Sequence, residues 1–113
     1  MNKKLYNEFI NQIENLSRAG NNENFFKDRF GIHHTKTQVL ESFVFHAREL
    51  TKYGEHIIAL ENILSNLDEV SITLDEETID LARQAFGERI TEEIELLLES
   101  LGDRGGGSVH RLV

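Results

Sequence analysis

Residues 54–86, GEHIIALENILSNLDEVSITLDEETIDLARQAF, contain the clearest structural pattern in the chain. In the first half, apolar residues recur every three to four positions, which places them on one face of a helix. These residues are Ile57, Leu60, Ile63, Leu64 and Leu67. The second half offers Thr73 or Asp75 as an N-cap, and Thr73 with Glu76 fits a capping box. The stretch predicts two amphipathic helices joined by a short acidic link.

The region before this stretch continues the helical pattern. Residues 2–19 predict a helix that ends at Gly20, where a left-handed cap suits glycine. Its apolar stripe consists of Leu5, Phe9, Ile10, Ile13 and Leu16. The segment ENFFKDRF, residues 23–30, predicts a short second helix closed by Gly31. Its phenylalanines are expected in the core, because aromatic side chains stabilise a fold mainly by burial. They are Phe25, Phe26 and Phe30.

A third helix is predicted from a cap at Thr35 or Thr37 to about Lys52, before Gly54. The residues expected on its inner face are Val39, Leu40, Phe43, His46, Ala47 and Leu50. The run FVF at 43–45 also suits a short strand, because aromatic and β-branched residues favour strands. Helix is the favoured interpretation of this segment, with the strand left open.

Residues 88–101 predict a last helix, capped from Thr91 and followed by Gly102. Its apolar face consists of Ile90, Ile94, Leu97, Leu98 and Leu101. The tail 103–113 contains three consecutive glycines and is expected to be flexible, because ordering glycine costs much backbone entropy. The whole pattern predicts an all-α protein: a single compact bundle of five to six helices over residues 1–102.

Several classes of chemistry have no support in the sequence. The chain of 113 residues has no cysteine, so it offers neither a disulfide nor a zinc–thiolate site. No segment approaches the roughly twenty apolar residues that cross a bilayer, and polar residues interrupt the N-terminus where a leader would be apolar. We therefore expect a soluble cytoplasmic protein without a membrane segment.

Catalytic and metal-binding patterns are also missing from the sequence. The histidines are His33, His34, His46, His56 and His110. None has the spacing to other histidines or to glutamate that helical metal sites use, and His46 is expected at the core boundary with a satisfied ring nitrogen. The serines lack a nucleophile-elbow pattern, and the three glycines of the tail lack the lysine of a phosphate-binding loop. We expect no enzymatic activity, no metal and no cofactor.

The negative charge of the chain is concentrated in its second half. The formal net charge is −8, yet residues 1–67 hold eight acidic and eight basic side chains. Residues 68–103 hold twelve acidic side chains against Arg83 and Arg89, a local charge of −10. Such a segment repels phosphate, which argues against direct nucleic-acid binding, and it attracts a basic partner. The alternative is that acidic helices only keep a small protein soluble.

The central stretch also resembles the C-terminal half of the MafI family of immunity proteins. The matching features are a Gly-Glu start, an Ala-Leu-Glu-Asn helix core, an Ile-x-Leu link and a helix with an acidic cap. The residues are Gly54, Glu55, Ala59, Leu60, Glu61, Asn62, Ile63, Leu67, Ile72, Leu74, Glu76, Glu77 and Ile79. This chain is longer than the usual member, and residues 88–113 have no assigned counterpart. The resemblance implies an immunity protein that binds the toxic C-terminal domain of a secreted effector, often a nuclease.

The family supplies no binding residues to carry over, so the toxin-binding site is predicted from charge. Nuclease active sites are commonly basic, and an acidic face could cover one. The residues predicted to form that face are Asp68, Glu69, Asp75, Glu76, Glu77, Asp80, Glu88, Glu92, Glu95 and Glu99. The alternative function is a small helical regulatory or adaptor protein that self-associates or binds a partner helix.

Overall fold

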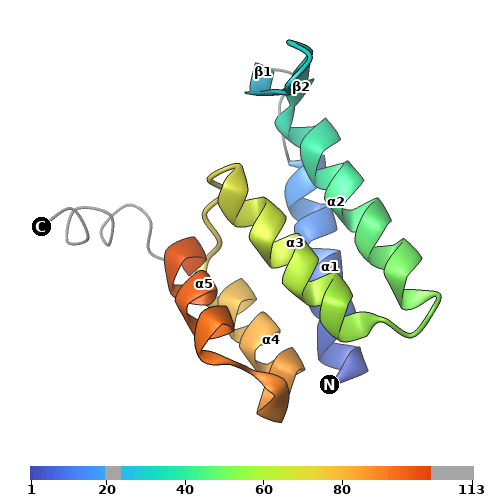
Figure 1. The fold of residues 1–113 in the computed structure, drawn as a ribbon, viewed down its shortest axis with the longest axis vertical. Helices are drawn as coiled ribbons and strands as arrows, with labels where there is room; N and C mark the ends of the chain where they lie inside the picture. The colour runs from blue at the N-terminus through green and yellow to red at the C-terminus, as the bar shows by residue number, and fades with distance from the viewer. Residues whose placement is uncertain (20–23, 103–113) are drawn as a thin grey trace, which may run out of the picture.

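Five α-helices and one small β-hairpin make up the protein in a computed structural model that describes residues 1–19 and 24–102 (Figure 1). The helices are α1 (Lys3–Arg18), α2 (Lys36–Thr51), α3 (His56–Glu69), α4 (Glu76–Phe86) and α5 (Glu92–Gly102). The hairpin strands are β1 (Asn24–Lys27) and β2 (His33–Thr35), and the 3₁₀ turn η1 (Gly87–Arg89) separates α4 from α5. The predicted all-α fold is confirmed, with the hairpin as a minor addition.

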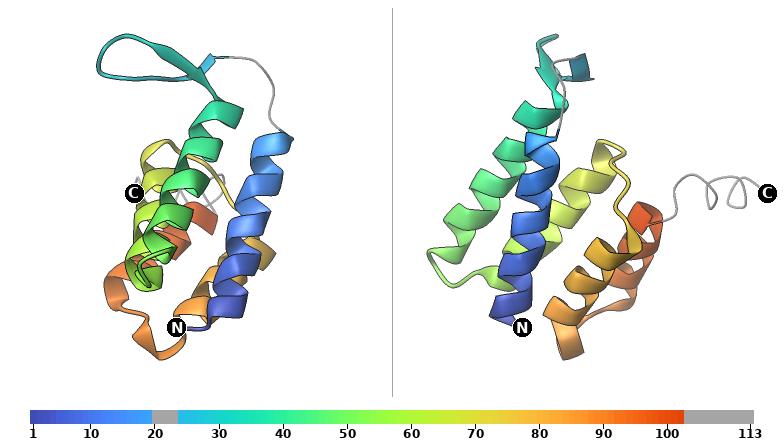
Figure 2. Two further views of the ribbon diagram at one scale, coloured as in Figure 1. Left: turned by 90° about the vertical axis from the view of Figure 1, so that its right-hand side faces the viewer. Right: turned by 180° about the vertical axis from the view of Figure 1, so that it is seen from behind.

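The five helices pack as a closed ring. α1 contacts α2 and α4, α3 contacts α2 and α5, and α4 contacts α5 to close the ring (Figures 1 and 2). Two main-chain hydrogen bonds tie segments that are distant in sequence: the amide of Asn2 donates to the carbonyl of Ala85 at 2.8 Å, and that of Leu74 to Leu101 at 2.9 Å. Both ends of the described chain are therefore tied to α4 and the link that precedes it.

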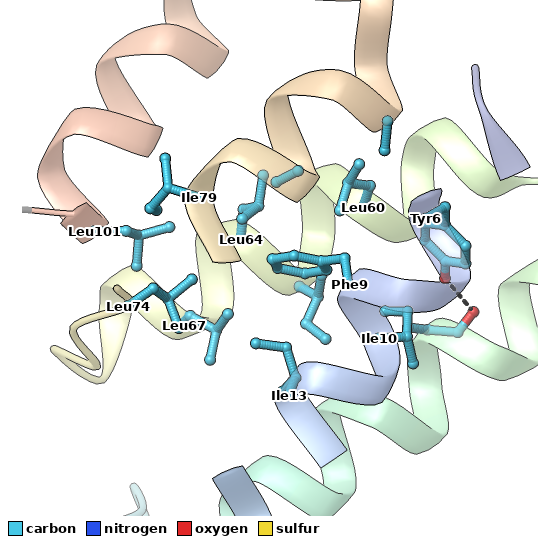
Figure 3. Packing of buried hydrophobic residues seen from close by; sticks show 14 of the residues in the cluster. Tyr6, Phe9, Ile10, Ile13, Leu60, Leu64, Leu67, Leu74, Ile79 and Leu101 are labelled. Atoms are coloured by element: carbon cyan, nitrogen blue, oxygen red, sulfur yellow. Dashed lines mark hydrogen bonds between the residues drawn. The ribbon is translucent and has the colours of Figure 1, made fainter. Parts of the chain in front are cut away.

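The core fills the middle of this ring. The large fully buried side chains come from every helix and from the α3–α4 link (Figure 3). They include Phe9, Ile13, Leu40, Leu60, Leu64, Leu74, Phe86 and Leu98. Each such side chain stabilises the fold by roughly 1.5–3 kcal/mol relative to its exposed state. The apolar spacing in residues 54–86 was thus a correct guide to the interior.

Side-chain caps start most of the helices where the sequence predicts. Thr35 forms a full capping box with Gln38, which settles the choice between Thr35 and Thr37. Asp75, not Thr73, is the N-cap of α4, and its carboxylate accepts a hydrogen bond from the amide of Thr78 at 2.8 Å. The Thr91 hydroxyl accepts from the amide of Ile94 at 3.2 Å. Gly20, Asn21, Asn22 and the predicted tail 103–113 lie outside the described residues.

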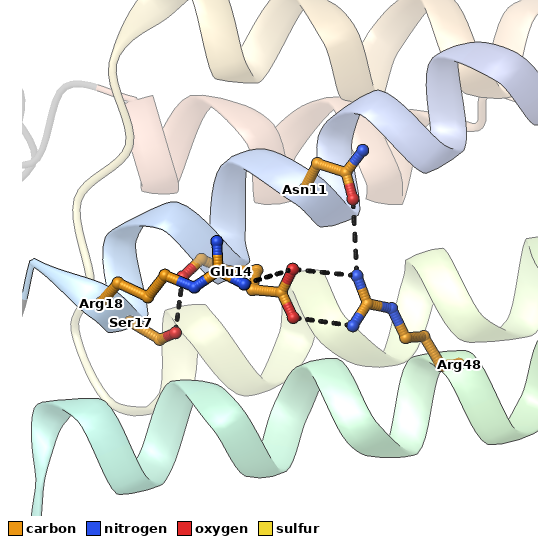
Figure 4. A network of polar contacts seen from close by, with 5 residues as sticks. All are labelled: Asn11, Glu14, Ser17, Arg18 and Arg48. Atoms are coloured by element: carbon orange, nitrogen blue, oxygen red, sulfur yellow. Dashed lines mark hydrogen bonds and ion pairs between the residues drawn. The ribbon is translucent and has the colours of Figure 1, made fainter.

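A polar network on the surface joins α1 to α2 (Figure 4). The guanidinium of Arg48 donates to both carboxylate oxygens of Glu14, at 2.7 and 3.2 Å, and to the side-chain oxygen of Asn11 at 3.4 Å. Arg18 lies 3.4 Å from the same Glu14 carboxylate. The hydrogen bond from Arg48 lowers the pKa of Glu14. Two adjacent helices are thereby fixed in register outside the core.

The helix predicted for residues 23–30 is wrong, because β1 and β2 form an antiparallel hairpin there. Asp28 explains the difference. Its carboxylate accepts hydrogen bonds from the amides of Phe30 and Ile32, both at 2.9 Å, and pairs with the Nε2 of His34 at 2.8 Å. An aspartate that satisfies local amides competes with helix formation and favours a turn. Gly31, with φ of +81°, completes the turn and does not end a helix.

The predicted burial of the three phenylalanines in this segment is also wrong. Phe25, Phe26 and Phe30 are 39%, 37% and 79% exposed. Among the helices, the hairpin packs mainly on the neighbouring part of α2, so it lies at the edge of the core. A two-stranded hairpin can point only a few side chains at a helix, which leaves the rest in solvent.

Helix α2 is rotated slightly from its predicted orientation. Val39, Leu40 and Ala47 are buried as expected, while Val44 is buried in place of His46. His46 is exposed, and its Nδ1 lies 2.8 Å from the carbonyl of Ser42. The strand considered for residues 43–45 does not form, because these residues lie within the helix. The expected core-boundary position of His46 is therefore wrong, although its ring nitrogen is satisfied.

Candidate partner-binding groove

The first turn of α4 carries the first part of the acidic segment. Asp75 caps the helix, and its hydrogen bonds from Thr78 lower the pKa of the Asp75 carboxyl. Glu76 and Glu77 follow in the first turn. Negative charge at a helix N-terminus is stabilising, because it lies next to the unpaired amides. These three acidic side chains thus stabilise the start of α4.

Arg83 links α4 to α5. Its Nε donates to Glu95 on α5 at 2.7 Å, and its NH1 group donates to Asp80, one turn earlier on α4, at 3.0 Å. These carboxylates raise the pKa of Arg83, with the hydrogen bond to Glu95 as the main cause. Asp80 and Glu95 are consequently neutralised in part by a partner within the chain.

Asp68 has a similar internal role at the end of α3. Its carboxylate accepts a hydrogen bond from the hydroxyl of Ser100 on α5 at 2.7 Å. This bond crosses the α3–α5 contact of the helical ring. Asp68 therefore joins two helices, and the sequence pattern alone could not distinguish it from a surface acid.

A groove of about 860 Å³ runs between α4 and α5. Apolar and charged side chains both line it: Leu74, Ile79 and Leu98, with Asp75, Glu76, Asp80, Arg83 and Glu99. Leu74, Ile79 and Leu98 lie beneath it as a floor and are almost fully buried, at 1%, 6% and 0% exposed, so little of their surface is accessible from the groove. Four carboxylates and one guanidinium give the lining an excess of three negative charges. The groove is therefore suited to a cationic group.

The groove between α1 and α2 provides a contrast. It has a volume of about 530 Å³, and its charged lining consists of Glu14, Glu41, Glu49, Arg18, Arg48 and Lys52. The lining contains three acidic and three basic residues, so its net charge is zero. Two smaller grooves flank the α2–α3 contact, each with one carboxylate, from Glu49 or Glu69. Among these four grooves, the excess of negative charge is greatest between α4 and α5.

The ten residues predicted to bind a toxin do not share one groove. Asp75, Glu76, Asp80 and Glu99 line the α4–α5 groove, and Glu95 reaches it through Arg83. Glu69 instead lines a groove beside the hairpin. The exposed residues Glu77, Glu88 and Glu92, together with the hydrogen-bonded Asp68, are outside the groove lining. The helical repeat explains this division, because adjacent residues on a helix point about 100° apart.

Sequence reasoning missed the apolar floor and the role of Arg83. Leu74 and Ile79 were named only in the family pattern, and Leu98 was assigned to the apolar face of the last helix. Arg83 was counted only as a basic residue in an acidic segment. Its position three residues after Asp80 was an available signal, since residues three apart on a helix are neighbours. Its contact with Glu95 depends on how α5 packs.

The part of the chain that the structure describes contains no cluster of three or more potential metal ligands. Within the same residues, no helix has the length and hydropathy needed to cross a membrane. Comparison of the chain with models of protein families, with curated proteins and with solved structures finds no match. The resemblance to the MafI family thus rests on the residues quoted for it, and the groove must be interpreted from its own geometry.

Proposed function

We propose that this protein is an immunity protein that binds a basic toxin domain, such as a nuclease, through the α4–α5 groove. The observation that supports this proposal most directly is the charge of the groove lining, an excess of three negative charges above a largely covered apolar floor. Lysine and arginine have the complementary chemistry, because an aliphatic stem can cover apolar surface while the charged head stays at the rim. The sequence resemblance supplies the class of partner.

In this proposal the groove residues have different roles. Glu76 is an exposed rim carboxylate at the start of α4 and receives a basic side chain of the toxin. Leu74, Ile79 and Leu98 lie beneath it as a largely covered apolar floor that holds α4 and α5 together. Arg83 fixes the spacing of the two helices through Glu95 and Asp80. Affinity then comes from a few buried contacts, while the other acidic side chains speed association and disfavour acidic partners.

Acidic residues outside the groove contribute differently. Glu77, Glu88 and Glu92 are exposed, and they add to the field that draws in a basic domain. Their effect is long-range and is screened within about 10 Å at 0.1 M salt. A substitution at these positions is expected to change the association rate slightly, whereas a substitution in the groove also changes the dissociation rate.

The proposal predicts that a neighbouring gene encodes an effector with a toxic C-terminal domain, and the test is coexpression with that domain. The wild-type protein should restore growth and bind the domain in a 1:1 complex, with an association rate that falls as salt rises. Glu76→Lys should weaken binding at least about tenfold, a free-energy change of about 1.4 kcal/mol. Glu88→Lys makes the same charge change at an exposed position outside the groove, and it should keep most of the affinity.

Two results would contradict the proposal. One is a wild-type protein that neither binds the adjacent toxin domain nor restores growth. The other is a complex in which Glu76→Lys and Glu88→Lys weaken binding equally, since a general field would then be sufficient and the groove would have no specific role. Circular dichroism of both variants confirms that the helices are intact.

A further inference from the structure

The hairpin presents an apolar tip to solvent. Phe30 and Ile32 lie in and beside its turn, and both are exposed, as are Phe25 and Phe26 on β1. The turn between the strands is held by the Asp28 carboxylate, which engages two amides and His34. The pKa of Asp28 is lowered by these bonds, mainly by that from His34. The apolar side chains are thus carried on a defined turn.

The hairpin and the first residue of α2, residues 24–36, carry a net positive charge. Residues 24–36 contain three basic side chains, Lys27, Arg29 and Lys36, and one acidic side chain, Asp28. The Asp28 carboxylate already accepts hydrogen bonds from two amides of the hairpin. The guanidinium of Arg29 lies 5.7 Å from the centre of the Phe30 ring. This spacing allows a cation–π contact and places a cation next to the exposed ring. The hairpin therefore offers an aromatic group and a positive charge together.

The α4–α5 groove has the complementary properties: an apolar floor and an acidic lining. It is also the largest of the grooves described above, at about 860 Å³. We propose that the hairpin of one molecule docks in the α4–α5 groove of a second copy. Phe30 then packs at the mouth of the groove, above the largely covered residues Leu74, Ile79 and Leu98, while Arg29 faces the carboxylates of Glu76 and Asp80.

The proposed contact between hairpin and groove must form between two copies of the protein and cannot form within one. The hairpin packs on α2, whereas α4 and α5 lie on the opposite part of the ring and contact α1 and α3 (Figures 1 and 2). One molecule consequently cannot fill its own groove with its own hairpin. Because the two contacting surfaces differ, the association is head-to-tail, and it produces either a closed ring or an open chain.

Sedimentation velocity of the full chain, without any partner, tests this inference directly. At about 50 mM salt the average sedimentation coefficient should rise with protein concentration, and at about 500 mM salt the rise should be much smaller, because screening weakens the charge contacts. Phe30→Ser and Glu76→Lys should each suppress the rise. Tyr53→Ser is a matched control for the first variant, with Tyr53 81% exposed and Phe30 79% exposed. Glu88→Lys is the control for the second.

Mixing the two interface variants gives the sharpest result. The Phe30→Ser protein keeps an intact groove, and the Glu76→Lys protein keeps an intact hairpin. Each is expected to be monomeric alone, while an equimolar mixture should form a 1:1 dimer and no larger species. A dimer is the limit because only one of the two possible contacts remains functional in each mixed pair.

A site-specific probe gives an independent readout. The chain contains no tryptophan, so Phe30→Trp introduces a single reporter at the tip. Its emission should shift to shorter wavelength as concentration rises at low salt, because the indole enters the groove. Leu96→Trp, at an exposed position on α5 outside the groove lining, should show no shift.

Three outcomes overturn the inference: wild-type protein that stays monomeric at every concentration, Glu76→Lys protein that still self-associates, or a variant mixture that stays monomeric. Persistent association of Glu76→Lys would instead indicate pairing between hairpins. If a toxin binds the same groove, as proposed above, a second copy competes with it, and this part of the inference rests on the proposed function. Sedimentation uses the protein alone, so failure of toxin binding and failure of self-association are distinguishable.

Discussion

Phenylalanine side chains are buried in the helical ring but exposed in the hairpin. Phe9 and Phe86 are completely buried in the ring, whereas Phe30 is 79% exposed at the hairpin tip. In the ring, each helix contacts at least two other helices, and their apolar faces converge on one cluster. Among the helices in the described part of the chain, the hairpin contacts mainly α2, and its phenylalanines are left partly or largely exposed.

This comparison shows that burial depends on which elements converge and that apolar character alone does not produce it. The ring gains stability because distant segments enclose each side chain from several directions. The hairpin is held instead by local hydrogen bonds to Asp28. We therefore expect substitutions in the ring to change global stability and substitutions in the hairpin to change local order or association.

The largest effect is expected from a matched pair of phenylalanine substitutions. Phe86→Ala should lower the free energy of unfolding by about 3–5 kcal/mol, because it removes transfer energy and leaves a cavity. Phe30→Ala should change that free energy by no more than about 0.5 kcal/mol, because its ring is exposed in the monomer. Urea unfolding at high salt and low protein concentration measures both. Equal losses would show that the hairpin belongs to the cooperative core.

A second difference should appear at alkaline pH between the two tyrosines. Tyr6 is 1% exposed, and burial raises its pKa to about 12. The unfolded chain loses this proton near the ordinary pKa of 10, while the folded protein keeps it. Stability is therefore complete below pH 10 and is lost as pH rises toward 12, by roughly 2–3 kcal/mol.

Variants at both tyrosines separate this effect from other alkaline titrations. Tyr6→Phe should remove the alkaline loss, although it also removes the hydrogen bond from the hydroxyl to the carbonyl of Ala47, 3.3 Å long. Tyr53→Phe, at an exposed position, should keep the wild-type profile. Urea unfolding of the three proteins at about pH 9 and about pH 12 is the measurement. An unchanged alkaline loss in Tyr6→Phe would rule out this residue as the cause.

The smallest effect concerns two aspartates that accept backbone hydrogen bonds in the two regions. Asp75→Ala removes the cap of α4 and should lower global stability by about 1 kcal/mol. Because folding lowers the pKa of Asp75, the wild-type contribution is present above about pH 4 and is lost as pH falls through the lower folded pKa. Asp28→Ala should leave the free energy of unfolding within about 0.5 kcal/mol of the wild-type value.

Hydrogen exchange distinguishes these two aspartates further. In Asp28→Ala, the amides of Phe30 and Ile32 lose their acceptor, so they should exchange faster while the core helices keep their protection. In Asp75→Ala, the increase should spread to the first turn of α4. If Asp28→Ala accelerates exchange throughout the ring, the hairpin is coupled to the core more strongly than its contacts indicate.

The helices were predictable because their signals are local. The spacing of Leu60, Ile63, Leu64 and Leu67 selects one face, and the caps at Thr35, Asp75 and Thr91 act within three residues along the chain. Such interactions can be recognised wherever they occur in a sequence. The hairpin was missed because aromatic residues suit both a core helix and a strand, and the choice depended on the turn around Asp28.

The binding groove was predictable only in part. The excess of acidic residues after position 67 is visible in the sequence, and four of the ten predicted residues do line the groove. Asp68 was indistinguishable in sequence from those four, although it bonds to Ser100 on another helix. The contact of Arg83 with Glu95 likewise depends on the packing of two helices separated by a turn.

The sequence by itself determined where helices form, where several of them begin, and that negative charge gathers in the second half of the chain. These properties follow from periodicity, capping and composition, which involve neighbours a few residues apart. Only the tertiary structure decided which acids face one another, which apolar side chains form a groove floor, and which phenylalanines remain outside. Those outcomes depend on how whole helices rotate and pack, and no local pattern fixes that.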